Sequence, residues 1–193
     1  MKKLVLLFVV VSFSSLAFAG SETINFEQYA EYTQITNQYS NLGVTFTNAL
    51  QLVAPGYDYF DFPPHSGNGL ITDDPGSTIS MFFAPGSAGL NVTGWFNAPA
   101  GMTVTAYNSL NQVIATFNGT TIPGTDQMFS LNANTYISYI TFTDLGGGDD
   151  ITLDDLTWSE IPEPSTPMMM TSGLLAFGLL WRRKLSLFRK SAS

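Results

Sequence analysis

Carboxylates are the side chains of this chain with the broadest capacity for chemistry. Asp154 and Asp155 follow a glycine-rich stretch, and Glu27 lies near the start of a β-rich region. Because the chain has no Lys or Arg between Leu4 and Trp181, these groups must be solvated, bonded to backbone N–H groups or held by a metal cation. Pairing of the first and last strands would bring Glu27 beside the two aspartates, where a structural calcium ion is one expectation. The alternative is a β-bulge in which one aspartate is solvated and the other accepts hydrogen bonds from backbone amides.

Catalytic chemistry has little support in the residue pattern. His65 is the only histidine, it lies in a turn-rich loop, and the chain has no Gly-x-Ser-x-Gly nucleophile elbow and no cysteine. Glycoside hydrolysis needs two carboxylates on either side of a cleft, and no spacing among the acidic residues singles out such a pair. We therefore expect no enzyme activity, with an extracellular glycan-acting hydrolase as the alternative.

The stretch Tyr57–Phe62 is unusually aromatic for a loop. Aromatic rings can stack on the apolar faces of sugars, and neighbouring carboxylates can accept hydrogen bonds from sugar hydroxyls. We therefore predict a ligand surface at Tyr57, Tyr59 and Phe60, with Trp95 as a further contact if it faces outward. The alternative is that these rings cover one end of the hydrophobic core.

The charge distribution excludes a nucleic-acid partner. The seven basic residues all lie near the two chain ends, and the fifteen acidic residues lie between Glu22 and Glu163. The central region therefore has no cation that could neutralise phosphates. Without cysteines, this region must be held together by core packing or a metal and not by disulfides.

Residues 20–159 have the pattern of an all-β domain. Short runs rich in Val, Ile, Thr, Phe and Tyr are separated by Gly, Pro, Asn and Asp, and no stretch keeps a helical period. The predicted strands are 23–27, 43–47, 50–53, 77–83, 91–97, 103–108, 112–118, 127–131, 136–143 and 151–158. Short strands with regular turns predict an antiparallel two-sheet sandwich of the jelly-roll type.

The N-terminal residues 1–19 have the features of a secretory signal peptide. Lys2 and Lys3 precede the apolar run Leu4–Val11, and Ala17 and Ala19 give a small-x-small cleavage pattern. We expect cleavage before Gly20, so that the protein is exported.

The C-terminal residues divide into a linker, a hydrophobic segment with a basic stop, and a short tail. Two prolines disfavour helix and sheet in the linker, residues 160–166. Residues 167–184 predict a single hydrophobic helix that anchors the chain in the membrane, although its apolar run is short for a full span. The cationic side chains that end this segment place the tail, residues 185–193, on the cytoplasmic side.

Three features in a fixed order at the C-terminus resemble the PEP-CTERM sorting signal, a motif also labelled after the C-terminus of ice-binding proteins. They are a proline-rich motif, an apolar segment and a basic cluster. The residues of the motif are Pro162, Glu163, Pro164, Ser165 and Thr166, and those of the basic cluster are Arg182, Arg183 and Lys184. The resemblance implies a Gram-negative bacterium whose exosortase, a membrane cysteine protease, recognises and removes the tail.

Parts of the central region are similar to the β-sandwich domains of other PEP-CTERM proteins, which share their architecture with carbohydrate-binding jelly rolls. The similar segments are Ile24–Glu27, Thr36–Phe46 and Ile151–Trp158. This resemblance implies a fold and not a ligand. We expect a non-enzymatic protein that crosses the inner membrane, is anchored transiently and then joins the envelope or extracellular matrix, with exopolysaccharide as partner. An ice-binding or adhesin-like surface protein is a further alternative.

Overall fold

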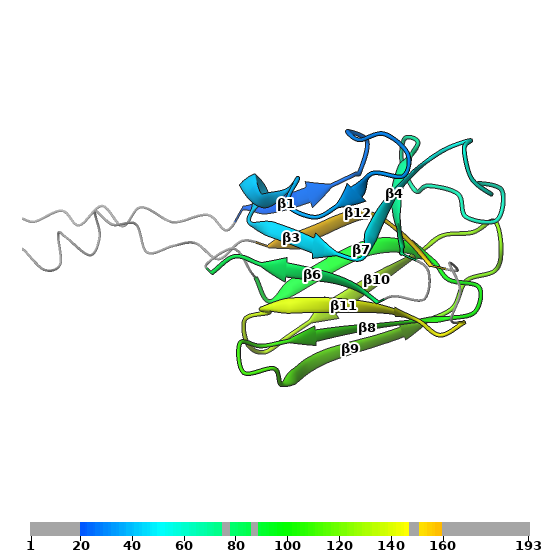
Figure 1. Ribbon diagram of the computed structural model, residues 1–193. Helices are drawn as coiled ribbons and strands as arrows, with labels where there is room; N and C mark the ends of the chain where they lie inside the picture. Colours follow the sequence, from blue (N-terminus) through cyan, green and yellow to red (C-terminus); the bar gives the residue numbers. More distant parts are fainter. Residues whose placement is uncertain (1–19, 75–77, 86–88, 147–150, 160–193) are drawn as a thin grey trace, which may run out of the picture. The chain divides into compact units, whose positions relative to one another are not determined.

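The computed structural model describes residues 20–74, 78–85, 89–146 and 151–159 (Figure 1). These residues belong to one compact unit, Ala19–Ile161. The signal peptide, the sorting motif and the hydrophobic helix predicted above lie outside the described residues. Within the described ranges, no helix is long and apolar enough to cross a membrane.

The domain is built from two antiparallel sheets (Figure 1). The larger sheet has the strand order β10-β7-β12-β5-β4-β2, and β1 also pairs with β12. Its strands are β1 (Ser21–Ile24), β2 (Gln34–Ile35), β4 (Ala49–Val53), β5 (Gly69–Asp73), β7 (Asn91–Asn97), β10 (Gln127–Asn132) and β12 (Thr152–Ser159). Strand β12 is therefore central to this sheet. One of its edges pairs with β7, and its other edge pairs first with β5, at Thr152 and Leu153, and then with β1, from Leu156 to Ser159.

The smaller sheet has the strand order β3-β6-β11-β8-β9. Its strands are β3 (Val44–Thr47), β6 (Ile79–Phe83), β8 (Met102–Tyr107), β9 (Val113–Gly119) and β11 (Tyr139–Asp144). A single 3₁₀ turn, η1 (Ser40–Leu42), precedes β3. The hairpin between β8 and β9 is closed by Asn108, whose side-chain oxygen accepts hydrogen bonds from the backbone of Leu110 (2.9 Å) and Gln112 (3.0 Å).

The predicted all-β sandwich of two antiparallel sheets is confirmed, and each predicted strand overlaps an observed one. Strands β2 and β5 were not predicted. All five residues of β5 are buried, because β5 lies between β4 and β12 and its outer face is covered by a loop. A strand buried on both faces shows no alternation of apolar and polar residues, so periodicity does not detect it.

The core lies between the two sheets and is rich in aromatic rings. The ring of Phe129 packs near those of Phe96, Phe117 and Phe142, with centroids 5.7–6.5 Å away. Gly94 lies opposite Phe129 in the register of β7 and β10. A Cβ atom at this glycine would lie 2.8 Å from the Phe129 ring and 2.5 Å from a Leu156 methyl group. The absence of a side chain there lets the ring pack directly over β7.

The connections between the strands gather at two ends of the sandwich, and these ends differ in charge. Ser21 and Ser159 pair with each other, so the domain begins and ends at the same end. The connections 36–43, 108–112 and 133–138 share this end and have no acidic residue. The described acidic residues other than Glu22 lie in the connections of the opposite end or in the adjoining strand ends. The carboxylates therefore gather far from the point where the C-terminal segment begins.

Candidate ligand-binding site

The outer face of the larger sheet supplies the floor of a pocket at the acidic end. Leu50 pairs with Thr72, and Thr72 pairs with Thr152, across three neighbouring strands. Ile71 and Leu153, which alternate with these residues, belong to the hydrophobic core. Because successive side chains of a strand point to opposite faces, Leu50, Thr72 and Thr152 point away from the core.

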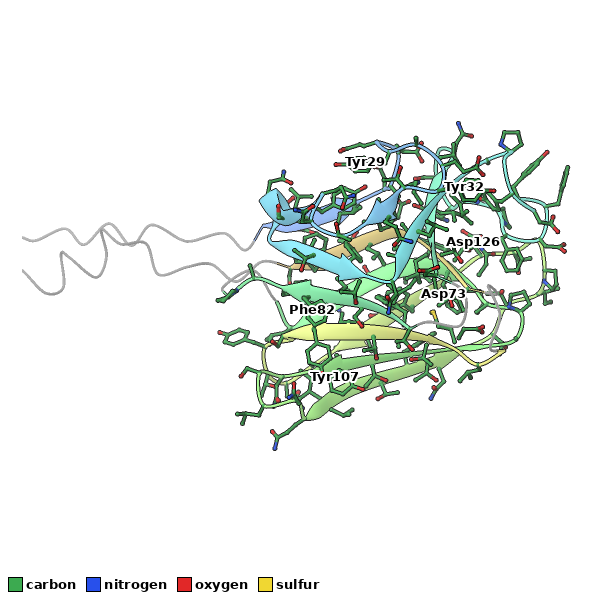
Figure 2. All side chains as sticks on the ribbon, in the orientation of Figure 1. Tyr29, Tyr32, Asp73, Phe82, Tyr107 and Asp126 are labelled. Atoms are coloured by element: carbon green, nitrogen blue, oxygen red, sulfur yellow. The ribbon has the colours of Figure 1, made fainter. Side chains whose placement is uncertain are left out.

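The long connection 54–68, together with Tyr32, encloses a pocket of about 380 Å³ over this floor. Its apolar lining consists of Tyr32, Leu50, Leu52, Tyr57 and Phe62. Its polar lining consists of Asp58, Thr72, Asp73 and Thr152. Figure 2 shows Tyr32 and Asp73 toward the same end of the sandwich as Asp126, whereas Phe82 and Tyr107 lie toward the other end. Apolar and aromatic walls with a few polar groups are typical of small-molecule sites.

Carboxylates hold the end of the 54–68 connection that leads into β5. One oxygen of Glu27 accepts hydrogen bonds from the backbone N–H groups of Asn68 (2.9 Å) and Gly69 (2.7 Å). Asp154 accepts a hydrogen bond from the backbone of Ser66 at 2.9 Å, and the Ser66 hydroxyl donates one to Asp155 at 3.1 Å. In a domain without Lys or Arg, backbone amides thus stabilise the exposed Glu27 and the buried Asp154, and the Ser66 hydroxyl stabilises the half-buried Asp155. These carboxylates in turn fix the loop.

A second group of contacts holds the middle of the connection against the acidic end of the sandwich. The imidazole of His65 stacks on Trp95 with ring centroids 3.6 Å apart and planes at 7°. Its Nδ1 atom also lies 2.5 Å from a carboxylate oxygen of Asp126. The Asn97 side chain donates a hydrogen bond to the Pro63 carbonyl at 2.9 Å, and Gly124 donates one to the carbonyl of Asp61 at 2.8 Å. These contacts fix the roof of the pocket.

Burial changes the ionisation of two groups beside the pocket. Burial raises the pKa of Asp154 to about 6, and the nearby Asp155 charge acts in the same direction, while backbone hydrogen bonds oppose the shift. Burial, with the charges of Asp154 and Glu31, also raises the pKa of the Tyr57 hydroxyl. This hydroxyl remains protonated and donates a hydrogen bond to the Phe62 carbonyl at 3.0 Å, which closes the turn that carries both rings.

The raised pKa of Asp154 predicts a specific dependence of stability on pH. Because the pKa is about 6 in the folded state and about 3.9 in an unfolded chain, the stability that Asp154 contributes is fully present below about pH 4 and is lost as pH rises to about 6. Relative to Asp154→Asn, which does not titrate, the wild-type domain should lose on the order of 2 kcal/mol of unfolding free energy over this range. Urea unfolding of both proteins from pH 4 to pH 7 measures the difference. A difference that stays constant with pH would contradict the burial of an ionisable Asp154.

The structure brings the three candidate calcium residues to one region but gives each carboxylate a partner in the backbone or in Ser66. Glu27 accepts hydrogen bonds from the backbone of Asn68 and Gly69, and Asp154 accepts one from that of Ser66, so both lie where the 54–68 connection leads into β5. The register of β7 and β12 shifts between Asp154 and Thr157, which marks a β-bulge, and Asp155 within it has a φ of 46°. Among the described residues, no three carboxylate or histidine side chains gather as a metal site. Calcium binding at Glu27, Asp154 and Asp155 stays a prediction.

The predicted ligand residues separate into three environments. Tyr57 lines the pocket. Tyr59 and Phe60 form a ring pair at 4.2 Å outside it, and the Phe60 side chain is 73% exposed. Trp95 faces outward, but His65 covers one face of its ring. Tyr57 therefore lies over the outer face of the larger sheet, and a ligand surface at Tyr59, Phe60 and Trp95 stays a prediction.

Most of the pocket lining has no recognisable signal in the sequence. Leu50, Leu52 and Thr152 lie on predicted strands, but nothing in the pattern says that their face is covered by a distant loop. Thr72 and Asp73 belong to the unpredicted strand β5. The contact of His65 with Asp126 joins residues 61 positions apart, and no local signal connects them.

Comparisons with known proteins give two kinds of result. A family model described as the PEP-CTERM protein-sorting motif matches residues 160–184, whereas no curated protein matches the chain. Among solved structures, the chain is similar to the K2 cleaved adhesin domain of Lys-gingipain, with 13% identity, a TM-score of 0.50, and coverage of 72% of this chain and 99% of that chain.

Two further solved structures have lower scores. The K1 cleaved adhesin domain of Lys-gingipain from Porphyromonas gingivalis W83 has a TM-score of 0.44 at 14% identity, with coverage of 72% of this chain and 96% of that chain. A family 29 carbohydrate-binding module complexed with cellulohexaose has a TM-score of 0.43 at 13% identity, with coverage of 72% and 91%. At these identities the likeness concerns the fold alone. The match at the C-terminus is specific, and residues 160–184 of this chain are a PEP-CTERM protein-sorting motif.

Proposed function

We propose that this protein is a non-enzymatic glycan-binding component of the cell envelope or extracellular matrix, associated with exopolysaccharide. The PEP-CTERM motif indicates a protein that is sorted by an exosortase to the outside of the cell. In this proposal, residues 167–184 hold the chain in the membrane until the exosortase cleaves it. The domain that remains, residues 20–159, carries the binding site.

The observation that carries the proposal is the pocket beneath the 54–68 connection. Tyr57 and Phe62 give it aromatic walls, and Thr72, Asp58 and Asp73 give it oxygen atoms. Sugars have apolar faces and a rim of hydroxyl groups, so a site of this composition suits them. Tyr59 and Phe60 lie beside the pocket in sequence, and the Phe60 ring, which is 73% exposed, can contact a sugar that extends from it.

A second aromatic surface, on the outside of the smaller sheet, suits a sugar less well. Phe82, Tyr139 and Tyr107 form a row across β6, β11 and β8, with centroids 5.5 and 4.5 Å apart and nearly parallel planes. Because the rings stack on one another, each covers the faces of its neighbours. Such cross-strand pairs stabilise a sheet, and we assign this row a structural role.

The environment of His65 supports a binding role over a catalytic one. One face of the imidazole packs on Trp95, and Nδ1 contacts Asp126. Both contacts fix the loop that roofs the pocket. The imidazole therefore has a structural use that accounts for its position without a general-base role.

The position of the site also suits a protein that is attached through its C-terminus. The domain begins and ends at the end of the sandwich opposite the carboxylates. Asp154 contacts the roof of the pocket, and four residues of β12 lie between it and Ser159. An extended strand rises about 3.3 Å per residue, so the pocket is held away from the start of the C-terminal segment.

The Tyr57→Ala variant tests the proposal because it removes an aromatic wall. We expect the wild-type domain, residues 20–159, to bind oligosaccharides of the cell's exopolysaccharide saturably, and the variant to bind at least about tenfold more weakly, as expected for the loss of a central aromatic contact. Isothermal titration calorimetry measures both. The matched control is Tyr136→Ala, which removes a 59% exposed tyrosine at the opposite end and should leave the affinity unchanged. Equal affinities of all three proteins would refute binding at this pocket.

A further inference from the structure

The charges around the pocket limit which glycans can enter it. Asp58 and Asp73 line the pocket. Glu31 and Asp154 lie close enough to Tyr57 that both raise the pKa of its hydroxyl. Two carboxylates thus line one small volume and two more lie near its Tyr57 wall, and the sequence has no Lys or Arg between Leu4 and Trp181 to offset them.

An anionic sugar would meet these carboxylates without a compensating cation. Repulsion between like charges is strong where the surroundings are partly apolar, and Leu50, Leu52 and Phe62 make this pocket so. An uncharged sugar meets the same carboxylates as hydrogen-bond acceptors for its hydroxyl groups, because ionised carboxylates only accept. The same residues therefore attract one class of glycan and repel the other.

The size of the pocket limits the length of chain that it holds. Its volume of about 380 Å³ lies at the lower end of the roughly 300–1,000 Å³ that small-molecule sites span. The contacts of Glu27, Asp154, Asn97 and Gly124 hold the roof over the floor at several points. The pocket thus suits a short segment of a glycan, and not a long stretch.

We infer that this pocket selects short segments of uncharged glycan and rejects uronic acids and other anionic sugars. This inference rests on the proposed glycan-binding function and adds the class of sugar that is bound. Asp58 should contribute most to the preference for uncharged over anionic sugars. It is exposed and belongs to the 54–68 connection that roofs the pocket, so an entering sugar passes it.

The test compares two chemical forms of one glycan. Exopolysaccharide purified from the producing cells is fragmented and divided into two portions. In the reduced form, the carboxyl groups are reduced to alcohols, which leaves uncharged sugars. In the oxidised form, the primary hydroxyl groups are oxidised to carboxylates, which adds negative charge. Titration calorimetry with the wild-type domain should show at least about tenfold tighter binding of the reduced form at low salt, with a smaller ratio at high salt because ions screen the repulsion.

Two variants assign the selection to the pocket. Asp58→Asn should lower the ratio of the two affinities severalfold, whereas Glu22→Gln, which removes one charge from β1 at a distance, should leave it unchanged. Equal or tighter binding of the oxidised form by the wild-type domain would overturn the inference while the glycan-binding function stands. Binding of neither form would overturn the proposed function itself.

Discussion

Cells that make the Glu163→Ala variant should keep this protein in its full-length, membrane-associated form. Glu163 lies between Pro162 and Pro164, and each proline fixes its own φ and keeps the preceding residue extended. A protease that binds an extended segment therefore meets the Glu163 carboxylate in a restricted geometry. Because this residue is the only charged one in the motif from Pro162 to Thr166, its loss should abolish processing.

Fractionation followed by intact-mass measurement checks this expectation. The wild-type protein should appear as a shortened form outside the inner membrane, and the variant should retain residues up to Ser193. The matched control is Glu160→Ala, which removes a carboxylate from the same linker but outside the Pro-Glu-Pro sequence, and should be processed as the wild type is. A wild-type mature mass that still includes Arg182–Ser193, in cells with an active exosortase, would refute the sorting role.

The Trp158→Ala variant should lose about 3–5 kcal/mol of unfolding free energy, the range that is typical for truncation of a large buried aromatic. Trp158 is fully buried and packs edge-on against Phe83 of the other sheet at 5.9 Å. It also lies on the central strand, opposite Glu22 of β1 and Val92 of β7. A loss of this size is a large part of the roughly 5–15 kcal/mol by which domains are stable.

Urea unfolding of residues 20–159 measures this loss. Tyr136→Ala serves as the control, because its exposed ring should change the stability by less than about 0.5 kcal/mol. A change below about 1 kcal/mol for Trp158→Ala would contradict the packing of the two sheets around this residue.

Much of the sandwich could be predicted from the sequence because most strands have one buried and one solvated face. Met102–Tyr107 alternates strictly between apolar and Thr residues until its last position, and the structure buries every second side chain of this strand. A β-bulge at Asp154 and Asp155 is one of the two alternatives that the sequence offers, and the structure has the bulge. Asp154 accepts the expected backbone hydrogen bond, whereas Asp155 is half-buried and bonds to Ser66 and is not simply solvated.

The pocket could not be predicted because it depends on contacts between distant parts of the chain. Strand β5 is buried on both faces, so it lacks the alternation that identifies a strand. The 54–68 connection is aromatic in sequence, but its position over Leu50 and Thr152 is fixed by hydrogen bonds to Glu27, Asn97 and Asp154. Local patterns therefore predicted that the loop could bind a sugar, but not which face of the sandwich it covers.

Removal of the two terminal segments would also change the net charge of the protein, and this charge affects which glycans it can bind. Every Lys and Arg of the chain lies in the predicted signal peptide or beyond Trp181. If both segments are removed, the mature domain has no Lys or Arg, and its described acidic residues other than Glu22 gather toward one end. Such a domain has no electrostatic attraction to an anionic polysaccharide, which agrees with the selection of uncharged sugars inferred above.

The most direct test of the account is incubation of the wild-type domain, residues 20–159, with the cell's own exopolysaccharide, followed by two readings on the same sample. Equilibrium binding is measured by calorimetry, and new reducing ends are measured over hours. The account predicts saturable binding that Tyr57→Ala weakens, with no increase in reducing ends. Release of reducing ends that is abolished by substitution of a single carboxylate, such as Asp58→Asn, would contradict it and establish a glycan hydrolase instead.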